Sequence, residues 1–537
     1  MRRLFSILLL FSLSFAACVG EVNMSLPAVS DGSGVLVGIT MRGIPGTGME
    51  YVGASPTVGT STQESLVTAA FVARGLSMRG EDCDLLVKVS DEDSPGGVEG
   101  PSAGAAFMLM AYSLLTGEEM SHDATITGAI GDGGEILPVG GLYEKALSAK
   151  IAGVESLVTP LQTVEEKLML RGISGVDIYE VSNATEAIEF FFYGVEPEER
   201  PLDLEVEPLE NITPYEGEKA AGMDGIVAGM IGSEMEAASR IEDQQVREYF
   251  EARAEQHEEL ERLGYEYAAA NGAFLTGISA SAIAEVAEPD IAAKKEEVQS
   301  CLDSLEEPNA TTANYQWIMG GEAREMRARR NYEKYVDIEP ETKDEEYLLV
   351  YQMGYSKAWC EAAKAMYAVE SEEGGDAVDG RKLRNIAEGL LNYTDDYGDW
   401  AEYAQAGQEL YDEGKYAGAI YELEFAKSMV EGDDALEAGA TDEDYALMME
   451  NESTSVWGRV FRGHSEYMEK TGSHEDAYRM IVFARNMDAV AEEVGADEAP
   501  PMEPVQRGES ICLPAFVLLG ALGTALCAGS AKKLIME

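Results

Sequence analysis

A serine and a lysine of this chain have the types and the spacing of a hydrolytic pair. Ser102 stands in the run Gly-Pro-Ser-Ala-Gly at residues 100–104, and Lys145 follows 43 residues later, after two glycines. A serine hydroxyl is a weak nucleophile, and a lysine amine that its surroundings keep neutral serves as the base that activates it. The pair therefore predicts peptide hydrolysis through an acyl-enzyme.

Each of these two residues is expected near the start of a helix. Residues 102–116 are small or apolar nearly throughout and Gly117 follows them, which predicts a buried helix with Ser102 in its first turn. The N–H groups and the partial positive charge at that helix end would stabilise an oxyanion beside the serine. A second helix is expected after Gly141, where the helix dipole and burial both oppose the charge of Lys145.

Taken alone, each residue also has a structural interpretation. A serine in a turn of small residues is common, and a lysine on an amphipathic helix usually lies on the solvated face. A catalytic lysine must be held neutral instead, and lowering its pKa from ~10.4 to ~7 takes about 4–5 kcal/mol. Burial among Ala, Leu and Val side chains supplies free energies of that order. The segments around the pair favour the catalytic interpretation.

Those segments resemble the proteolytic domain of Lon-type proteases, whose Ser-Lys dyad has the same order and spacing. The resemblance covers roughly residues 34–195 and rests on three further motifs: Gly96-Gly97-Val98-Glu99, Thr125-Ile126-Thr127-Gly128 and Glu135-Ile136-Leu137-Pro138-Val139. It implies the α/β fold of that domain, with Ser102 as the nucleophile and Lys145 as the base. Because such relatives assemble into rings of six, it also implies a homo-oligomer, with a hexamer as the expected form.

Two supporting residues follow from the same resemblance. Thr127 matches a residue that orients the lysine by a hydrogen bond, and its alternative is a plain β-branched strand residue. Glu99, three residues before the serine, matches an acidic residue that lines the site in relatives, and its alternative is a solvated loop carboxylate.

The sequence also departs from the family. Pro101 stands where archaeal membrane-bound relatives tend to carry an acidic residue, so this position looks more like the bacterial form. Tyr143 stands where a second lysine is common, which we expect to affect peptide binding rather than chemistry. No Gly-x-x-x-x-Gly-Lys-[Ser/Thr] phosphate loop occurs, so we expect no ATPase motor and substrates that are unstructured polypeptides.

Other hydrolytic chemistry has little support. The four histidines are His122, His257, His464 and His474, and only His122 lies in the region with the motifs, where it is expected in a loop at a strand entrance. A Ser-His-Asp triad would have to recruit a histidine from outside that region. Neither His-Glu-x-x-His nor Cys-x-x-Cys occurs, so no metal site and no cofactor are expected.

The two ends of the chain predict export and membrane anchoring. Residues 1–20 have the basic start and apolar run of a signal peptide, with cleavage near Ala16 or Ala17 and lipidation of Cys18 as the alternative fate of the leader. Residues 511–531 carry no charge and precede two lysines, which predicts a transmembrane helix whose last residues are cytoplasmic. A buried core helix is the alternative. The body is then expected outside the cytoplasm, held to the cell membrane.

Charge and sequons agree with an exported body. Asp and Glu number 99 against 39 Lys and Arg, and the net charge of −60 repels nucleic acid and anionic lipid and suits concentrated salt. A Cys301–Cys360 disulfide fits that compartment, whereas the state of Cys83 stays open. Asn183 has a second interpretation as a helix N-cap. Asn-x-Ser/Thr acceptors of N-glycosylation occur at Asn23, Asn183, Asn211, Asn309, Asn392 and Asn451.

Between the ends, the pattern predicts an α/β domain at 34–195 and a mostly α-helical domain at 216–495. A linker rich in Pro and Glu at 196–215 joins them, about ten helices are expected in the second domain, and a stalk follows at 496–510. A capping box at Ser61-Thr62-Gln63-Glu64 is expected to open a helix of the first domain. Its strands are expected at 34–41, 84–90, 123–130, 135–139, 156–159 and 176–181.

One stretch of the helical domain, from Gly407 to Ala426, is similar in spacing to a tetratricopeptide repeat. Such repeats need about three copies to be stable, and no second copy is recognised in the sequence. An ordinary helical hairpin is therefore the preferred interpretation.

We therefore expect an ATP-independent, membrane-anchored, extracytoplasmic serine endopeptidase that uses a Ser102–Lys145 dyad on unstructured polypeptides. The helical domain would capture substrates or hold the protein to partners at the cell surface. The alternative from a different class is a non-catalytic surface scaffold or docking protein that retains a Lon-like domain. A peptidase specialised for one protein, such as itself, is a third interpretation.

Overall fold

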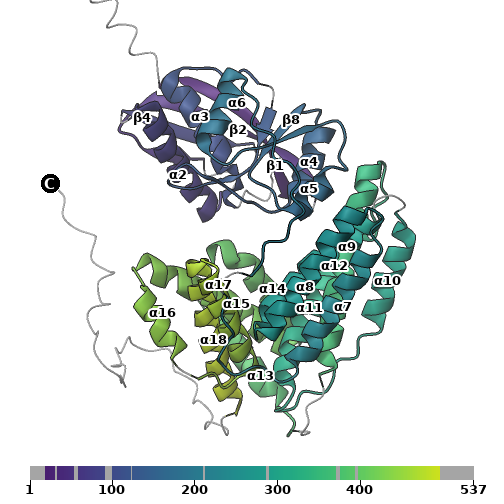
Figure 1. Cartoon of the computed structure of the whole chain (residues 1–537). Coiled ribbons are helices and arrows are strands. Elements are labelled where there is room, and N and C mark those ends of the chain that lie inside the picture. Colours follow the sequence, from purple (N-terminus) through teal and green to yellow (C-terminus); the bar gives the residue numbers. More distant parts are fainter. Residues whose placement is uncertain are drawn as a thin grey trace, which may run out of the picture. The chain divides into compact units, whose positions relative to one another are not determined.

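A computed structural model describes the chain from Cys18 to Gly495 with short gaps (Figure 1). Met1–Gly495 form one unit of the chain, and the predicted stalk and anchor that follow lie outside the described residues. The predicted leader up to residue 17 lies outside them as well. The described ranges are 18–30, 33–53, 58–80, 82–90, 100–122, 124–209, 212–285, 289–369, 375–393, 397–450 and 452–495.

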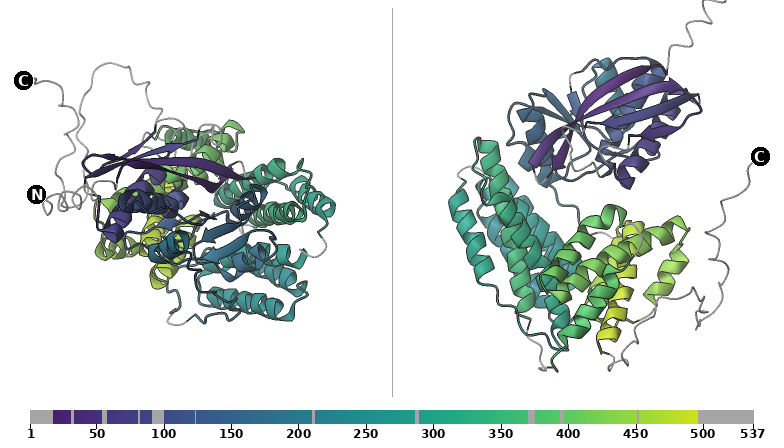
Figure 2. Two further views of the ribbon diagram at one scale, coloured as in Figure 1. Left: turned by 90° about the horizontal axis from the view of Figure 1, so that it is seen from above. Right: turned by 180° about the vertical axis from the view of Figure 1, so that it is seen from behind.

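The N-terminal domain is built on a four-stranded sheet in the order β1-β2-β4-β3. β1 (Gly20–Ser30) pairs antiparallel with β2 (Ser33–Pro45), and β2 pairs antiparallel with β4 (Cys83–Val89), which runs parallel to β3 (Glu50–Val52). Every second residue of β2 from Val37 to Met41 is buried, which is the period of a strand with one face on a core. Two helices, α2 and α3, pack on that face in one hydrophobic core (Figure 2).

The rest of this domain is a parallel three-stranded sheet, a hairpin and further helices. The sheet has the order β5-β8-β9, and the hairpin pairs β6 with β7. The bounds are α2 (Thr60–Ser77), α3 (Gly104–Thr116), β5 (Ala124–Ile126), β6 (Ala129–Ile130), β7 (Ile136–Leu137), α4 (Leu142–Ile151), β8 (Ser156–Thr159), α5 (Val164–Leu170), β9 (Asp177–Glu180) and α6 (Ala184–Tyr193).

The α/β character predicted from the sequence is confirmed, with three corrections. β1 lies before the expected start of the domain, and it begins inside the last residues assigned to the leader. The strand expected at 123–130 is two strands, β5 and β6, because the chain breaks at Thr127-Gly128, where Gly128 has a φ of 154°. Ser61 is not the N-cap that the predicted capping box needs: Gly59, which has no side chain, is the N-cap of α2.

The segment predicted as a linker runs along its neighbours as an extended chain. Arg200 forms an ion pair with Glu186 of α6 and donates a hydrogen bond to the main-chain oxygen of Glu180. Farther on, Leu204 and Val206 pack beside the buried Phe250 of the helical domain. The described part of this segment is therefore anchored by side chains at several points.

The C-terminal domain is helical, with twelve α-helices among the described residues where about ten were expected. They are α7 (Met223–Ser239), α8 (Gln244–Arg262), α9 (Glu266–Glu285), α10 (Ile291–Asp303), α11 (Tyr315–Tyr335), α12 (Lys343–Tyr367), α13 (Gly380–Leu391), α14 (Ala401–Asp412), α15 (Tyr416–Glu437), α16 (Asp442–Met449), α17 (Val456–Lys470) and α18 (His474–Gly495).

The stretch compared with a tetratricopeptide repeat is the hairpin of α14 and α15, and two further hairpins combine the same turn with a buried alanine five residues after its glycine. In each turn a glycine with positive φ donates to the carbonyl three residues back, and the next residue donates to the carbonyl five residues back. A fully buried alanine follows each glycine by five residues. The glycine and alanine pairs are Gly264 and Ala269, Gly414 and Ala419, and Gly472 and Ala477.

Two disulfides lie within the described residues. Cys301–Cys360, a pairing that the sequence left open, joins α10 to α12, and Cys18–Cys83 joins a residue two positions before β1 to the first residue of β4. The predicted leader boundary at residue 20 is thus too late, because Cys18 is already part of the folded domain. Cleavage near Ala16 or Ala17 stays a prediction. None of the helices described by the structure is long and apolar enough to cross a bilayer.

Candidate active site

Ser102 and Lys145, 43 residues apart in the sequence, line the same pocket. The pocket has a volume of about 340 Å³ and lies between β1, β2, the start of α3 and the start of α4. Apart from these two side chains and Thr62, its walls are apolar side chains and glycines. They are Leu26, Pro27, Ala28, Val29, Val35, Val37, Ile39, Val89, Gly100, Ala103, Phe107, Gly140 and Gly141.

Ser102 lies in a short 3-10 turn, Pro101–Ala103, that leads into α3. The first N–H groups of such a turn have no partner within the helix, so they point outward at the helix end. Proline suits the first position because it has no N–H to leave unpaired. The serine is therefore held where a helix N-terminus presents donors, as the sequence predicted, with the regular α-helix starting two residues later at Gly104.

Three hydroxyl residues of α2 hold the backbone just before the serine. Thr62 donates to the Gly100 carbonyl oxygen (2.9 Å), Ser61 accepts from the Gly100 N–H (3.1 Å), and Ser65 donates to the Pro101 carbonyl oxygen (3.0 Å). All three are buried, and Gly100 has a φ of 101°, a conformation that favours glycine. These side chains, which the sequence suggested as a helix cap, instead fix the approach of the chain to Ser102.

Thr127 acts on the serine rather than on the lysine. Its hydroxyl donates to the main-chain oxygen of Ser102 (3.4 Å), which also accepts the N–H of Gly128 (3.0 Å). The N–H of Ala105 in turn donates to the Gly128 carbonyl oxygen (3.0 Å). Thr127 is thus a buried residue of the site, but the predicted hydrogen bond to Lys145 is not formed in this structure.

Lys145 is 4% exposed and lies in the first turn of α4. The main-chain N–H of Lys145 donates to the carbonyl oxygen of Gly141. Gly141 has a φ of 68°, which turns the chain sharply into the helix. Burial lowers the pKa of Lys145 from 10.5 to about 8, against the opposing effect of the Glu144 carboxylate. About a tenth of the amine is therefore neutral at pH 7 and half of it at pH 8, and only this neutral form can act as a general base.

β1 supplies a wall of the pocket that the sequence prediction left out. Leu26 and Val29 of this strand line the pocket together with Lys145 of α4. The signal was present, because Glu-Val-Asn-Met-Ser-Leu at residues 21–26 alternates polar and apolar side chains as a half-buried strand does. It was lost because the first of these residues adjoin the predicted leader.

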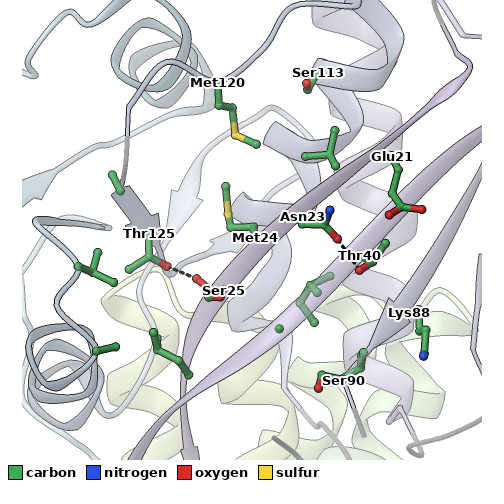
Figure 3. A pocket seen from close by; sticks show the side chains of 18 of the residues that line it. Glu21, Asn23, Met24, Ser25, Thr40, Lys88, Ser90, Ser113, Met120 and Thr125 are labelled. Carbon is green, nitrogen blue, oxygen red and sulfur yellow. Dashed lines mark hydrogen bonds between the residues drawn. The ribbon is translucent and has the colours of Figure 1, made fainter. Parts of the chain in front are cut away.

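The other predicted residues lie elsewhere. Glu99 lies outside the described residues. His122 lies in the loop before β5, as expected, and stacks on Phe190 with ring centroids 4.7 Å apart. A larger pocket of about 1080 Å³ opens over β1 and β2, with polar side chains such as Asn23 and Thr40, and it contains neither Ser102 nor Lys145 (Figure 3).

An α/β domain with a serine and a buried lysine in one apolar pocket has the arrangement of a hydrolase site. Residues 58–184 match the family described as the Lon protease (S16) C-terminal proteolytic domain. This part of the chain is a Lon-type proteolytic domain, which confirms the resemblance seen in the sequence.

Curated relatives match over the same region. Lon protease of Erwinia amylovora is 33% identical over 165 residues, which are 29% of this chain and 20% of that protein. Lon protease of Escherichia coli K12 is 32% identical over 165 residues, with the same shares. Lon protease 2 of Syntrophobacter fumaroxidans is 42% identical over 91 residues, 16% of this chain and 11% of that protein. The chain spans about a fifth of the length of the first two.

Proposed function

We propose that this protein is an ATP-independent serine endopeptidase that cleaves unstructured polypeptides with Ser102 and Lys145. The observation that carries the proposal is that both side chains line one apolar pocket in which burial brings the pKa of the lysine to about 8. The sequence supports the absence of a motor, because it holds no phosphate loop.

The mechanism follows from the positions of these groups. Neutral Lys145 takes the proton of the Ser102 hydroxyl, whose oxygen attacks the peptide carbonyl and forms a tetrahedral intermediate. The N–H groups at the start of the turn Pro101–Ala103 stabilise the oxyanion. The lysine then donates the proton to the leaving amine, and a water molecule that it deprotonates releases the acyl-enzyme.

We also propose that the protein is held to the membrane by 511–531 with its body outside the cytoplasm. Two disulfides in the body support an oxidising compartment. The sequons at Asn23, Asn309 and Asn392 are exposed and accessible to glycosylation, whereas Asn183 caps α6 and bonds the N–H groups of Thr185 and Glu186. A homo-oligomer, expected as a hexamer, belongs to the same proposal.

The test is hydrolysis of unfolded casein by the full chain in detergent, without ATP and across a salt series. Ser102→Ala and Lys145→Ala are expected to abolish cleavage, and Ser102→Ala is also expected to abolish labelling by a serine-reactive fluorophosphonate. Lys88→Ala is the matched control, because Lys88 is an exposed lysine of β4 outside the pocket. Cleavage that survives Lys145→Ala would contradict the dyad.

A second candidate is a non-catalytic scaffold that retains the proteolytic domain. The three hairpins with a common turn favour it, because stacked helix pairs build extended binding surfaces. Folded wild-type protein that neither cleaves casein nor takes up the fluorophosphonate at any salt concentration would support this candidate.

A further inference from the structure

The helix that carries Lys145 is buried from both sides. One side of α4 packs on β1 and β2 and faces the pocket. On the other side, Leu142, Tyr143 and Leu147 share a hydrophobic cluster with Tyr347 and Leu348 of α12, in the helical domain. The catalytic helix is therefore in contact with residues about 200 positions later in the sequence.

Polar contacts reinforce this junction. The Tyr143 hydroxyl donates to the main-chain oxygen of Asp344 (3.1 Å), and the Asp344 carboxylate pairs with Lys150 at the end of α4. The Gln352 amide nitrogen donates to the Glu144 carboxylate (2.9 Å), and both side chains are buried. Since Glu144 precedes Lys145 directly, the last of these bonds places a group of the helical domain one residue from the proposed base.

The charge of Glu144 is sensitive to that bond. Burial raises the pKa of Glu144, while the Gln352 amide lowers it by hydrogen bonding to the carboxylate. The carboxylate in turn raises the pKa of Lys145, which burial lowers. Loss of the amide therefore weakens the charge of Glu144, which favours protonated Lys145.

Other ionisable groups surround the pair but do not duplicate this contact. In the pocket, the lining residues of β1 and β2 carry no ionisable side chain. The ionisable neighbours on the packed helices are Tyr143 on α4, Glu166 on α5, Lys334 and Tyr335 on α11, and Asp344, Tyr347 and Tyr351 on α12.

We propose that Gln352 is a positioning residue through which the helical domain regulates the peptidase site, by holding the Glu144 carboxylate beside Lys145. The proposal rests on the peptidase function proposed above. A partner that moves α12 away from α4 would break this bond and change the pH range in which the enzyme works. The helical domain is in this sense a regulator of the base as well as a binding module.

The experiment measures hydrolysis of a fluorogenic peptide by the full chain from pH 6 to 10 for wild type, Gln352→Leu, Glu144→Gln and the double variant. A neutral base is required, so a weaker Glu144 charge moves the rising limb of kcat/KM to lower pH. We expect a shift of about half a unit for Gln352→Leu and about one unit for Glu144→Gln. The double variant should match Glu144→Gln alone, because Gln352 has no further carboxylate to act on.

Leu348→Ala is the matched control, since it removes apolar packing of the same junction without changing the charge beside Lys145. Its pH midpoint should equal that of wild type. Thermal unfolding of each variant shows that it is folded. Equal midpoints for folded wild type and folded Gln352→Leu would overturn the proposal while leaving the peptidase function intact. Failure of that function is distinct, because wild type itself would then show no cleavage that depends on Lys145.

Discussion

At Lys145, burial acts on two measurable properties, the protonation of the amine and the stability of the fold. The folded pKa of about 8 lies below the unfolded value of 10.5, so the native state disfavours the proton. The unfolded chain binds more protons between these two values, and stability therefore rises with pH across that window. Well below pH 8 the amine is charged in both states, and burying that charge lowers the free energy of unfolding by its largest amount.

The first prediction concerns activity against pH. Because the proposed base is the neutral amine, kcat/KM of the full chain on a fluorogenic peptide should rise with pH and reach half its plateau near pH 8. The salt concentration is held constant through the titration, since it screens the acidic surface. A profile that is flat from pH 6 to 9 would show that the titration of Lys145 does not limit the reaction.

The second prediction separates stability from function at the same residue. Lys145→Met should abolish cleavage and stabilise the fold at pH 7 by up to ~3 kcal/mol, because an apolar chain of similar length replaces a buried ammonium. Urea unfolding at pH 7 and at pH 10.5 checks this, and the gain should vanish at the higher pH. Lys88→Met, at an exposed position of β4, should change stability by less than about 0.5 kcal/mol at either pH.

The third prediction concerns the hydroxyl that holds the backbone before the nucleophile. Thr62→Val removes the partly buried hydrogen bond to the Gly100 carbonyl oxygen, at a cost of about 1 kcal/mol. We expect kcat to fall at least tenfold because the position of Ser102 loosens, with a smaller change in KM. Thr116→Val, at the far end of α3, is the control and should leave kcat unchanged.

At the scale of elements, the close approach of β2 to the catalytic helix depends on one glycine. A Cβ at Gly34 would lie 1.9 Å from the main-chain oxygen of Glu144 and 2.8 Å from the Cβ of Ser148. Neither atom belongs to a flexible side-chain end, so β2 and α4 would have to separate. The spacing of strand and helix around Lys145 therefore allows no side chain at this position.

The fourth prediction follows from that contact. Gly34→Ala should lower stability by about 1–3 kcal/mol and reduce cleavage, because α4 shifts away from the pocket. Gly75→Ala is the matched control, since a Cβ there meets nothing within 4 Å and the residue lies within α2. That variant should gain up to about 1 kcal/mol from the better helix propensity of alanine. Equal unfolding midpoints for the two variants would contradict the argument.

Elements with a local signal could be predicted, and contacts between distant segments could not. β8 was predicted at its observed bounds, because a short apolar run flanked by polar turns is sufficient for a buried strand. Ser102 and Lys145 were placed by their motifs, and the pocket brings them together as expected. The hydroxyl groups of α2 bond a loop almost 40 residues away, and Gln352 bonds Glu144 from 208 residues away. No periodic pattern in the sequence indicates such distant contacts, so neither role could be predicted.

The three hairpins with a common turn are a second case of a feature that could not be predicted from the sequence. The turn at Gly414 was noticed because Tyr416 follows it, whereas Glu266 and His474 stand at that place in the other two hairpins. What the three turns share is the backbone conformation of the glycine and the burial of the alanine, which a single sequence does not display. The structure therefore shows two further hairpins with this turn and a buried alanine, which residue identity had hidden.

At the scale of the whole molecule, the fifth prediction concerns the stability that a disulfide gives to the fold and the oxidation state of the cysteines. Cys301–Cys360 closes a chain segment with a separation of 59 residues, so its loss should lower stability by roughly 4 kcal/mol. The double variant Cys301→Ala/Cys360→Ala, followed by urea unfolding, checks this. Alkylation of the unfolded, non-reduced protein should leave Cys18, Cys83, Cys301 and Cys360 unmodified, and labelling of all four would contradict an oxidising compartment.

The sulfur of Cys18 can carry one covalent partner besides its own Cβ, and in the structure that partner is Cys83. A lipid thioether on Cys18 and this disulfide are therefore mutually exclusive products of the same atom. A lipidated chain would leave Cys83 as a buried thiol at the start of β4, detectable by alkylation after unfolding. A reductant would likewise release the residue that precedes β1, the strand whose side chains form one wall of the pocket. The redox state of the surroundings thus affects the candidate active site through Cys18, the first residue that the structure describes.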